Sequence, residues 1–212
     1  MATINQDGVT RLMNAINNAN ATFANSMKNG TTNFANATAA IWESNNAVKF
    51  ASNLKTDLDN IADSYKKSVQ GIYDVLTTNV SNHNKRNDGS VSVSSLDYSA
   101  PDTSALSSKI KNKFGDGSEG VKEGSDISSV QADYTKAMET IKESLDDAVN
   151  ATAKSEAFGT DEINTFKTAY QKIKTSFEKI EQEEANSLRT FLEKEKEADT
   201  KLASTNKSNL GQ

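Results

Sequence analysis

The 212-residue sequence contains no cysteine, a single proline (Pro101), a single histidine (His83) and a single tryptophan (Trp42). The absence of thiols excludes disulfides, thiolate catalysis and cysteine-ligated zinc or iron–sulfur sites. One histidine cannot supply a multi-histidine metal site, and a general acid or base needs positioned partners that the sequence does not indicate around His83. We therefore expect a non-enzymatic protein with no metal and no cofactor.

Long apolar runs are also absent. No stretch approaches the roughly 18 consecutive apolar residues that a membrane-spanning helix requires. The segment from Met1 to Asp7 has neither the basic nor the apolar part of a cleaved signal peptide. We expect a chain without a membrane span that does not use the general secretory route.

An excess of positive charge is the third absence. The net charge is −5; residues 1–90 carry eight basic and seven acidic side chains, and residues 91–212 carry sixteen and twenty-two. Nucleic-acid binding depends on a positive field, which neither half provides. We expect no nucleic-acid partner.

What the sequence does contain is typical of long helices. Hydrophobic residues make up 35% and charged residues 25% of the chain, a balance that suits amphipathic helices with broad polar faces. Apolar residues recur three or four positions apart in four stretches, which predicts four helices: about 6–41, then 47–80, 127–153 and 163–192. Residues 29–32 are a weak point for a kink or break in the first helix. The heptad spacing of the last stretch fails after Ile180, which predicts a register shift near Glu184.

The joints between these stretches indicate the fold. A short joint from Trp42 to Asn46, with Ser44 as a favoured helix N-cap, predicts that the first two helices fold back as an antiparallel hairpin. Residues 86–125 are rich in serine and glycine and predict a linker with one short helix near 103–114. The predicted domains are a hairpin with a tryptophan turn over 1–85, this linker, and a second hairpin with a frayed C-terminus over 126–212. The predicted fold class is all-α, with two tandem antiparallel helical hairpins that pack as an elongated four-helix bundle.

The two hairpins share a pattern. Adding 116 to the residue number aligns Trp42 with Phe158 and Ser44 with Thr160, and brings much of the apolar stripe into one register. Duplication of a hairpin explains this pattern, and chance alignment of two amphipathic helices is the alternative. The residues predicted at the two bends are Trp42, Glu43, Ser44, Phe158, Gly159 and Thr160.

Each hairpin has an apolar face that must be covered, by the other hairpin or by a second chain. We predict association through these faces, with a protein partner or by self-association, including a homo- or heterodimer. The predicted association face consists of Phe50, Leu54, Ile61, Ile72, Leu76, Phe166, Tyr170, Ile173, Phe177 and Ile180.

Trp42 allows two interpretations. An aromatic side chain buries about 150–250 Å², so Trp42 can seal the end of a two-helix core. A tryptophan at a hairpin tip can also present rigid apolar area to a partner.

The first hairpin resembles a known family. Trp42-Glu43-Ser44 between two helices, followed by Ala47-Val48-Lys49-Phe50-Ala51, is similar to the small Trp-X-Gly helical-hairpin proteins of type VII secretion, the early secreted antigenic target group. Ser44 stands where the family usually has glycine, and Phe158-Gly159-Thr160 replaces the motif in the second hairpin. The family's C-terminal export signature is a tyrosine followed four positions later by an acidic residue. Phe191 with Glu195 is a relaxed version of it, whereas Tyr98 with Asp102 has Pro101 between them.

This resemblance implies a folded helical protein that is secreted without a cleaved signal peptide, with hairpins that pair as four-helix bundles. A tandem chain then corresponds to a dimer fused into one polypeptide. The expected function is that of a non-enzymatic protein exported by, or partnering in, bacterial type VII secretion and acting through helix–helix association. The alternative is a structural assembly protein, such as a phage or virion component or a helical spacer, located in the cytoplasm or the virion.

Overall fold

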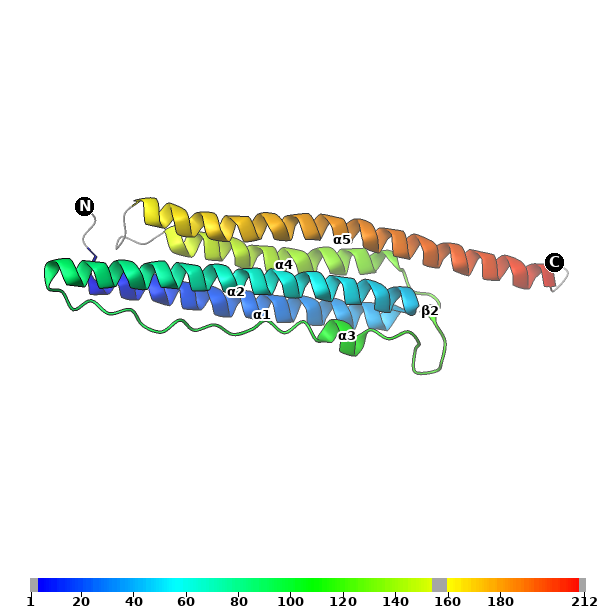
Figure 1. Cartoon of the computed structure of the whole chain (residues 1–212). Helices are drawn as coiled ribbons and strands as arrows, with labels where there is room; N and C mark the ends of the chain where they lie inside the picture. The colour runs from blue at the N-terminus through cyan, green and yellow to red at the C-terminus, as the bar shows by residue number, and fades with distance from the viewer. Residues whose placement is uncertain (1–3, 154–159, 210–212) are drawn as a thin grey trace. The chain divides into compact units, whose positions relative to one another are not determined.

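The computed structural model describes residues 4–153 and 160–209 and shows an all-α protein (Figure 1). The predicted helical fold class is confirmed. In chain order the elements are α1 (Gln6–Ile41), β1 (Trp42–Glu43), α2 (Asn45–Asn87), α3 (Ala105–Lys109), β2 (Gly120–Val121), α4 (Ser128–Ala153) and α5 (Thr160–Asn209). None of the described helices combines the length and the apolar character that a membrane span needs.

The chain forms two compact units, and each contains a segment of all four long helices. Unit 1 takes its residues from Met1–Met27, Asp59–Asp102 and Thr140–Glu178. Unit 2 takes its residues from Lys28–Leu58, Thr103–Glu139 and Lys179–Gln212. Each unit therefore draws on both halves of the sequence.

Helix α1 begins and continues as its side chains dictate. Asn5 caps it, because its Oδ1 accepts a hydrogen bond from the Gly8 amide at 2.8 Å. The helix does not break at 29–32, so that expected weak point does not end it. Thr31 is buried, and its hydroxyl donates to the Lys28 carbonyl oxygen at 3.2 Å. Burial of this turn outweighs the low helix propensity of its residues.

The core of unit 1 contains aromatic rings from both hairpins. Phe23 of α1 stacks on Tyr65 of α2 with ring centroids 4.1 Å apart, and Tyr65 lies 5.6 Å from Tyr170 of α5. The Tyr65 hydroxyl donates to Asn20 Oδ1 at 3.1 Å, which satisfies a buried polar pair. The two hairpins therefore share one core in this unit.

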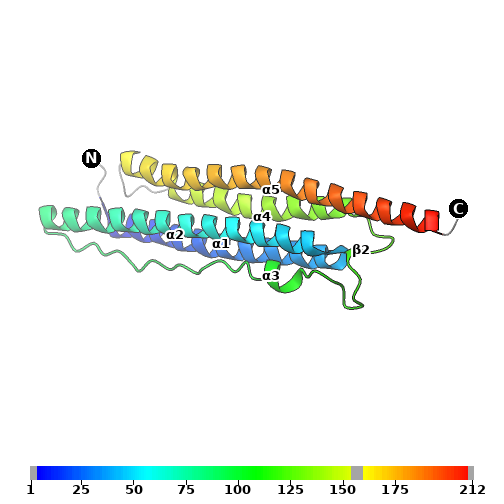
Figure 2. The same cartoon turned by 45° about the vertical axis from the view of Figure 1, so that its right-hand side comes forward.

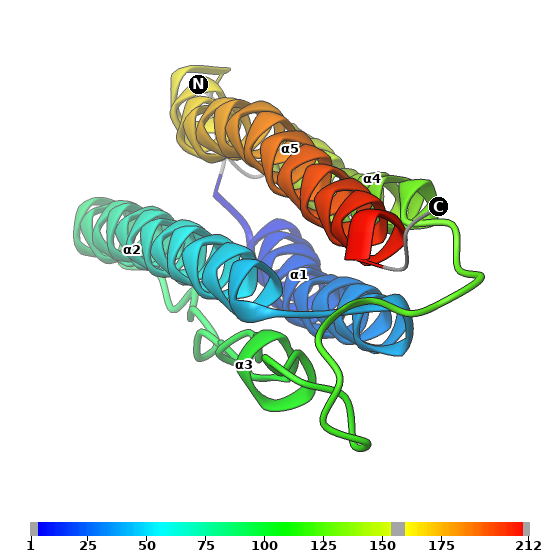
Figure 3. The same ribbon diagram turned by 90° about the vertical axis from the view of Figure 1, so that its right-hand side faces the viewer.

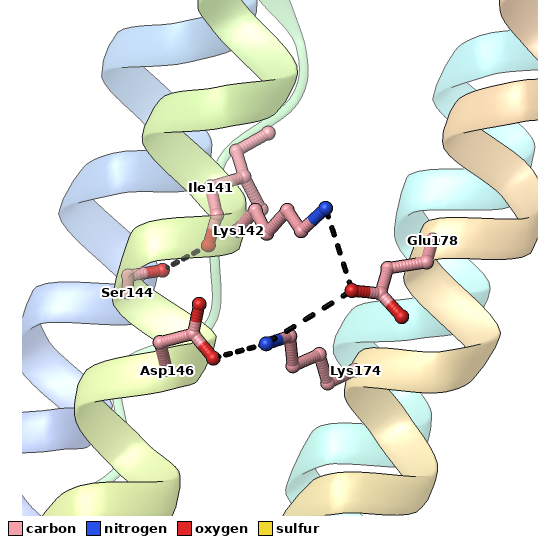
Figure 4. A network of polar contacts seen from close by, with 6 residues as sticks. All are labelled: Ile141, Lys142, Ser144, Asp146, Lys174 and Glu178. Carbon is pink, nitrogen blue, oxygen red and sulfur yellow. Dashed lines mark hydrogen bonds and ion pairs between the residues drawn. The ribbon is translucent and has the colours of Figure 1, made fainter.

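Ion pairs join α4 to α5 at the edge of unit 1 (Figure 4). Lys174 pairs with Asp146, and Glu178 Oε1 lies 3.4 Å from Lys142 Nζ and 3.9 Å from Lys174 Nζ. The Ser144 hydroxyl donates to the Ile141 carbonyl oxygen at 2.6 Å within α4. Partly exposed ion pairs contribute little stability, so this network orients α5 against α4 more than it strengthens the fold.

The core of unit 2 is a second aromatic cluster. The centroid of the Phe50 ring lies 6.0 Å from that of Phe34, 6.1 Å from that of Tyr134 and 6.4 Å from that of Phe191. Rings from α1, α4 and α5 thus surround this residue of α2. The Tyr134 hydroxyl donates to the Glu181 carbonyl oxygen at 2.8 Å. Edge-to-face contacts of this kind add to the energy of burial, and here too both hairpins contribute.

The stripe of α5 changes spacing where the sequence predicts a register shift. After Phe177 the next buried positions are Glu184, Leu188, Leu192 and Glu195, which follow at intervals of seven, four, four and three. Two successive intervals of four move the seam around the helix relative to a strict heptad. The shift also places two carboxylates, Glu184 and Glu195, in the buried stripe.

An extended segment follows α2. Residues 91–98 have no helix or strand of their own and lie against the unit 1 parts of α1 and α2, to which they are hydrogen-bonded (Figure 2). We refer to residues 91–98 as the strap. The sequence predicted only a linker here, because its serine-rich composition does not reveal side-chain partners far away in the chain.

Candidate functional site

The site begins at the bend between α1 and α2, which lies in unit 2 (Figure 3). Trp42 follows the last residue of α1, so it is not part of a continuous helix, and its side chain is 0% exposed. Its burial supports the sealing interpretation, because a fully covered ring offers no surface to a partner. The predicted hairpin bend at Trp42 is confirmed.

A short strand pair fixes the backbone of the bend. β1 pairs antiparallel with β2, with Trp42 opposite Val121 and Glu43 opposite Gly120, and the Lys122 amide donates to the Ile41 carbonyl oxygen at 2.8 Å. Gly120 has φ +105°, a conformation that a residue with a Cβ rarely adopts. The chain before α4 therefore closes over the first bend.

Ser44 links the bend to α5. Its hydroxyl oxygen accepts a hydrogen bond from the Ala47 amide at 3.2 Å, which confirms the predicted N-cap of α2. The same hydroxyl donates to Glu195 Oε1 at 2.6 Å, and Asn46 Nδ2 donates to that oxygen at 2.9 Å. Glu195 is 6% exposed, and its carboxylate lies at the positive end of the α2 dipole. These contacts compensate for burying a charge.

The relaxed signature residues of α5 both contact the start of α2. Phe191 packs its ring 6.4 Å from that of Phe50, and Glu195 binds Ser44 and Asn46. Sequence reasoning identified Ser44 as a cap and Phe191 with Glu195 as a pair, but did not connect them. The available signal was the position of Glu195 on the apolar stripe, because a carboxylate there needs a polar partner.

Burial near the bend also raises the pKa of two other carboxyl groups. Burial raises the pKa of Glu43, an effect that the charge of Lys111 opposes. Burial also raises the pKa of Asp199, and the neighbouring Glu195 charge adds to the increase. In the part of the chain that the structure describes, no group of three or more histidine, aspartate or glutamate side chains is placed to hold a metal ion. The arrangement is one of capping and pairing between helices.

A double-mutant cycle tests the link between Ser44 and Glu195. Hydrogen bonds to charged groups contribute about 1.5–3 kcal/mol, so we expect a coupling energy of about 1–2 kcal/mol between Ser44→Ala and Glu195→Ala in urea unfolding. Loss of the N-cap itself cancels in the cycle. The control is Ser44→Ala combined with Glu193→Ala on the exposed face of α5, for which we expect additivity. Additivity of the Ser44 and Glu195 variants would contradict the link.

The predicted bend of the second hairpin lies mostly outside the described residues. Phe158 and Gly159 belong to the gap between residues 153 and 160, and Thr160 is the first residue of α5. The comparison of the two bends that the repeat suggests therefore stays a prediction.

The predicted association face lies inside the chain's own units. Nine of its residues are buried at 3% exposure or less, and Ile180 is half-buried. Phe50 contacts rings of both hairpins in unit 2, and Tyr170 contacts Tyr65 in unit 1. Amphipathic periodicity identified residues that pack, but it could not tell whether the covering helix belongs to the same chain.

Glu184 is a buried carboxyl group in unit 2, where the sequence predicted only a register shift. Glu184 is 8% exposed in the seam of α5, and within the described structure its Oε2 has no hydrogen-bond partner by distance and angle. Burial raises its pKa to about 7, and the nearby charges of Asp57 and Glu183 add to the increase. The raised pKa means that a larger fraction of Glu184 is protonated near neutral pH than of an ordinary glutamate.

Comparison with known proteins adds no relative: no family model matches the chain, and no match was found among curated proteins or among solved structures.

Proposed function

We propose that this chain is a non-enzymatic helical protein exported by, or partnering in, type VII secretion, and that one chain supplies both hairpins of a paired unit. The observation that carries the proposal is the contact between the two sequence features that resemble that family. Trp42-Glu43-Ser44 forms the first bend, and Glu195 of the relaxed signature accepts hydrogen bonds from Ser44 and Asn46. The features are about 150 positions apart in sequence and meet in one unit.

The shared cores support the second part of the proposal. The resemblance implies that hairpins act in pairs, and in each unit of this protein the apolar stripes of both hairpins cover one another. A chain with its association face already buried has no need of a second copy. The large apolar side chains that remain exposed in the described residues are Val48, Val75 and Leu202.

The oligomeric state follows from this burial. We expect the purified chain to be a monomer of 22.9 kDa by size-exclusion chromatography with light scattering. The mass should not change over a hundredfold range of concentration, since the described residues leave no large apolar face exposed to drive dimerisation. A stable dimer at micromolar concentration would contradict the proposed pairing within one chain.

Export is tested in the native host. Deleting the type VII motor ATPase should remove the protein from the culture medium and leave it in the cells, while a protein secreted by the general route stays in the medium. An unchanged level in the medium would refute export by this route.

The bend contact can be tested in the same assay. We expect Glu195→Ala to reduce the exported fraction while the chain stays helical by circular dichroism, and Glu193→Ala to leave export unchanged. Equal export of both variants would separate the contact from the export function.

Assembly remains a second candidate function, favoured by the continuous helices of 43 and 50 residues in α2 and α5. Such helices suit a spacer in a larger particle. Recovery of the protein in fixed stoichiometry from purified particles, with none in the medium, would support assembly over export.

A further inference from the structure

The strap is held by amide side chains of the helices in unit 1. Gln6 of α1 binds both polar groups of one strap residue: its Oε1 accepts from the Ser92 amide at 2.8 Å and its Nε2 donates to the Ser92 carbonyl oxygen at 3.0 Å. Asn84 of α2 does the same with Val91, accepting at 3.1 Å and donating at 2.7 Å. Each side chain thus pairs with the strap as a peptide group of a neighbouring strand would.

Two further amides of α1 continue this row. Asn17 Oδ1 accepts from the Asp97 amide at 2.9 Å, and Asn17 Nδ2 donates to the Ser95 carbonyl oxygen at 3.2 Å. Asn20 Nδ2 donates to the Asp97 carbonyl oxygen at 2.8 Å. Asn20 is buried, and its Oδ1 accepts a hydrogen bond from the Tyr65 hydroxyl. This bond fixes the orientation of the amide, so that its amino group faces the strap.

The strap side chains sort by polarity. Its apolar residues are half-buried and its aspartate and serines are exposed; the half-buried residues are Val91, Val93, Leu96 and Tyr98. Tyr98 lies 6.5 Å from the buried Tyr65 ring, donates to the Ala62 carbonyl oxygen at 3.2 Å and has Lys66 Nζ 5.7 Å from its ring centroid. Apart from the Tyr98 hydroxyl, the polar strap side chain that binds the helices here is Ser92, which donates to Gln6 Oε1 at 3.2 Å.

This pattern defines what kind of segment can bind to the surface of α1 and α2 beneath the strap. The helices read the peptide backbone at Val91, Ser92, Ser95 and Asp97, and they accept apolar side chains at roughly alternate positions. Recognition through main-chain groups is the mode by which a sheet edge binds an extended peptide, and it tolerates many sequences. In this protein the side-chain amides of two helices take the place of the sheet edge.

We propose that the surface of α1 and α2 beneath the strap is a binding site for an extended peptide, that the strap occupies it in cis, and that an extended segment of a partner protein with alternating apolar residues replaces the strap. Most of these hydrogen bonds are exposed or partly buried, and each contributes only about 0.5–1.5 kcal/mol. A partner segment that forms the same bonds can therefore compete with the strap. Covalent attachment gives it an effective concentration in the millimolar range, which excludes weak competitors. The inference does not depend on the secretion proposal.

The experiment uses the full chain with a weakened strap. Ser92→Pro together with Asp97→Pro removes the two backbone amide donors that bind Gln6 and Asn17. The residues of α1 and α2 beneath the strap stay unchanged. The probe is a fluorescein-labelled synthetic peptide of residues 90–99, followed by fluorescence anisotropy. We expect the weakened chain to bind this peptide at least tenfold more tightly than the wild-type chain does.

Two controls make the result specific to the amides. Adding Gln6→Ala and Asn17→Ala to the weakened chain should reduce peptide affinity at least tenfold, and a peptide with proline at both positions should bind poorly to every chain. Circular dichroism checks that all variants stay helical. Absence of binding to the weakened chain, equal binding to wild type, or binding that survives loss of both amides would overturn the proposal.

A second copy of the chain is the competing occupant. The wild-type chain would then form a concentration-dependent dimer that Gln6→Ala with Asn17→Ala abolishes. That result would show that the strap of another copy binds α1 and α2, and it would overturn the assignment to a partner protein.

Discussion

Replacing Trp42 by alanine is expected to lower the free energy of unfolding by about 3–5 kcal/mol, the range for truncating a large buried aromatic side chain. Trp42 is the largest fully buried side chain of the described residues, and it belongs to β1, which pairs with β2. Urea unfolding followed by circular dichroism measures the change, because the variant has no tryptophan fluorescence.

Two further variants separate packing from chemistry. In the described structure Trp42 Nε1 is buried without a hydrogen-bond partner, so Trp42→Phe loses volume but also removes an unsatisfied donor. We expect it to cost less than half as much as Trp42→Ala. Val48→Ala, at a 39% exposed position in the first turns of α2, should cost less than about 1 kcal/mol. A small effect of Trp42→Ala would show that Trp42 does not seal this core.

Raising the pH from 5 to 8.5 is expected to destabilise the wild-type chain through Glu184. The pKa of Glu184 is about 7 in the folded chain and near its ordinary value of 4.5 in the unfolded chain. Between these values the folded chain keeps a proton that the unfolded chain loses, so stability is highest at low pH and falls as the pH rises. A pKa difference of this size corresponds to a loss of at most about 3 kcal/mol in the free energy of unfolding. The loss is complete once the pH is well above the pKa of Glu184 in the folded chain.

The surroundings of Glu184 explain why the charge is unfavourable. Asp57 faces it from α2, Glu181 and Glu183 flank it on α5, and the electrostatic influence of Glu184 reaches Tyr134 on α4. Burial and the charges of Asp57 and Glu183 are what oppose its ionisation. Replacing Glu184 by an uncharged side chain of the same shape should therefore remove this pH dependence.

Glu184→Gln is the corresponding variant. We expect it to unfold at nearly the wild-type urea concentration at pH 5 and to be more stable than wild type by about 2–3 kcal/mol at pH 8.5. Glu193→Gln is the matched control, since it removes a carboxylate from an exposed position of α5 that does not contribute to the raised pKa of Glu184. Parallel stability curves for wild type and Glu184→Gln would contradict a raised pKa at Glu184.

The helices were predictable because their signal is local. The spacing of apolar residues predicted a first helix over 6–41, and α1 has these bounds. The Ser44 cap was predictable for the same reason, as a single hydroxyl placed before an apolar stripe. Breaks were less predictable, because the burial of Thr31 that favours the helix is a property of the folded chain and not of the local sequence.

The polar contacts were not predictable because their partners lie far away in the chain. Asn17 and Asn20 read as weak helix formers, yet they bind strap residues 77 to 80 positions later. Glu195 and Ser44 are 151 positions apart. A periodic pattern shows that a charged residue falls on a buried face, as Glu184 and Glu195 do, but it does not name the residue that compensates for it.

Both hairpins pair within one chain in this structure, and cross-linking at the first bend tests this pairing. The natural absence of cysteine allows a clean pair, Asn45→Cys with Lys196→Cys, at exposed positions next to the contact between Ser44 and Glu195. A short bismaleimide should join these two thiols within one chain at low micromolar concentration. The product is one polypeptide that carries one linker and has no free thiol, and single-cysteine variants cannot form this internal link. Links found only between two chains would contradict the account.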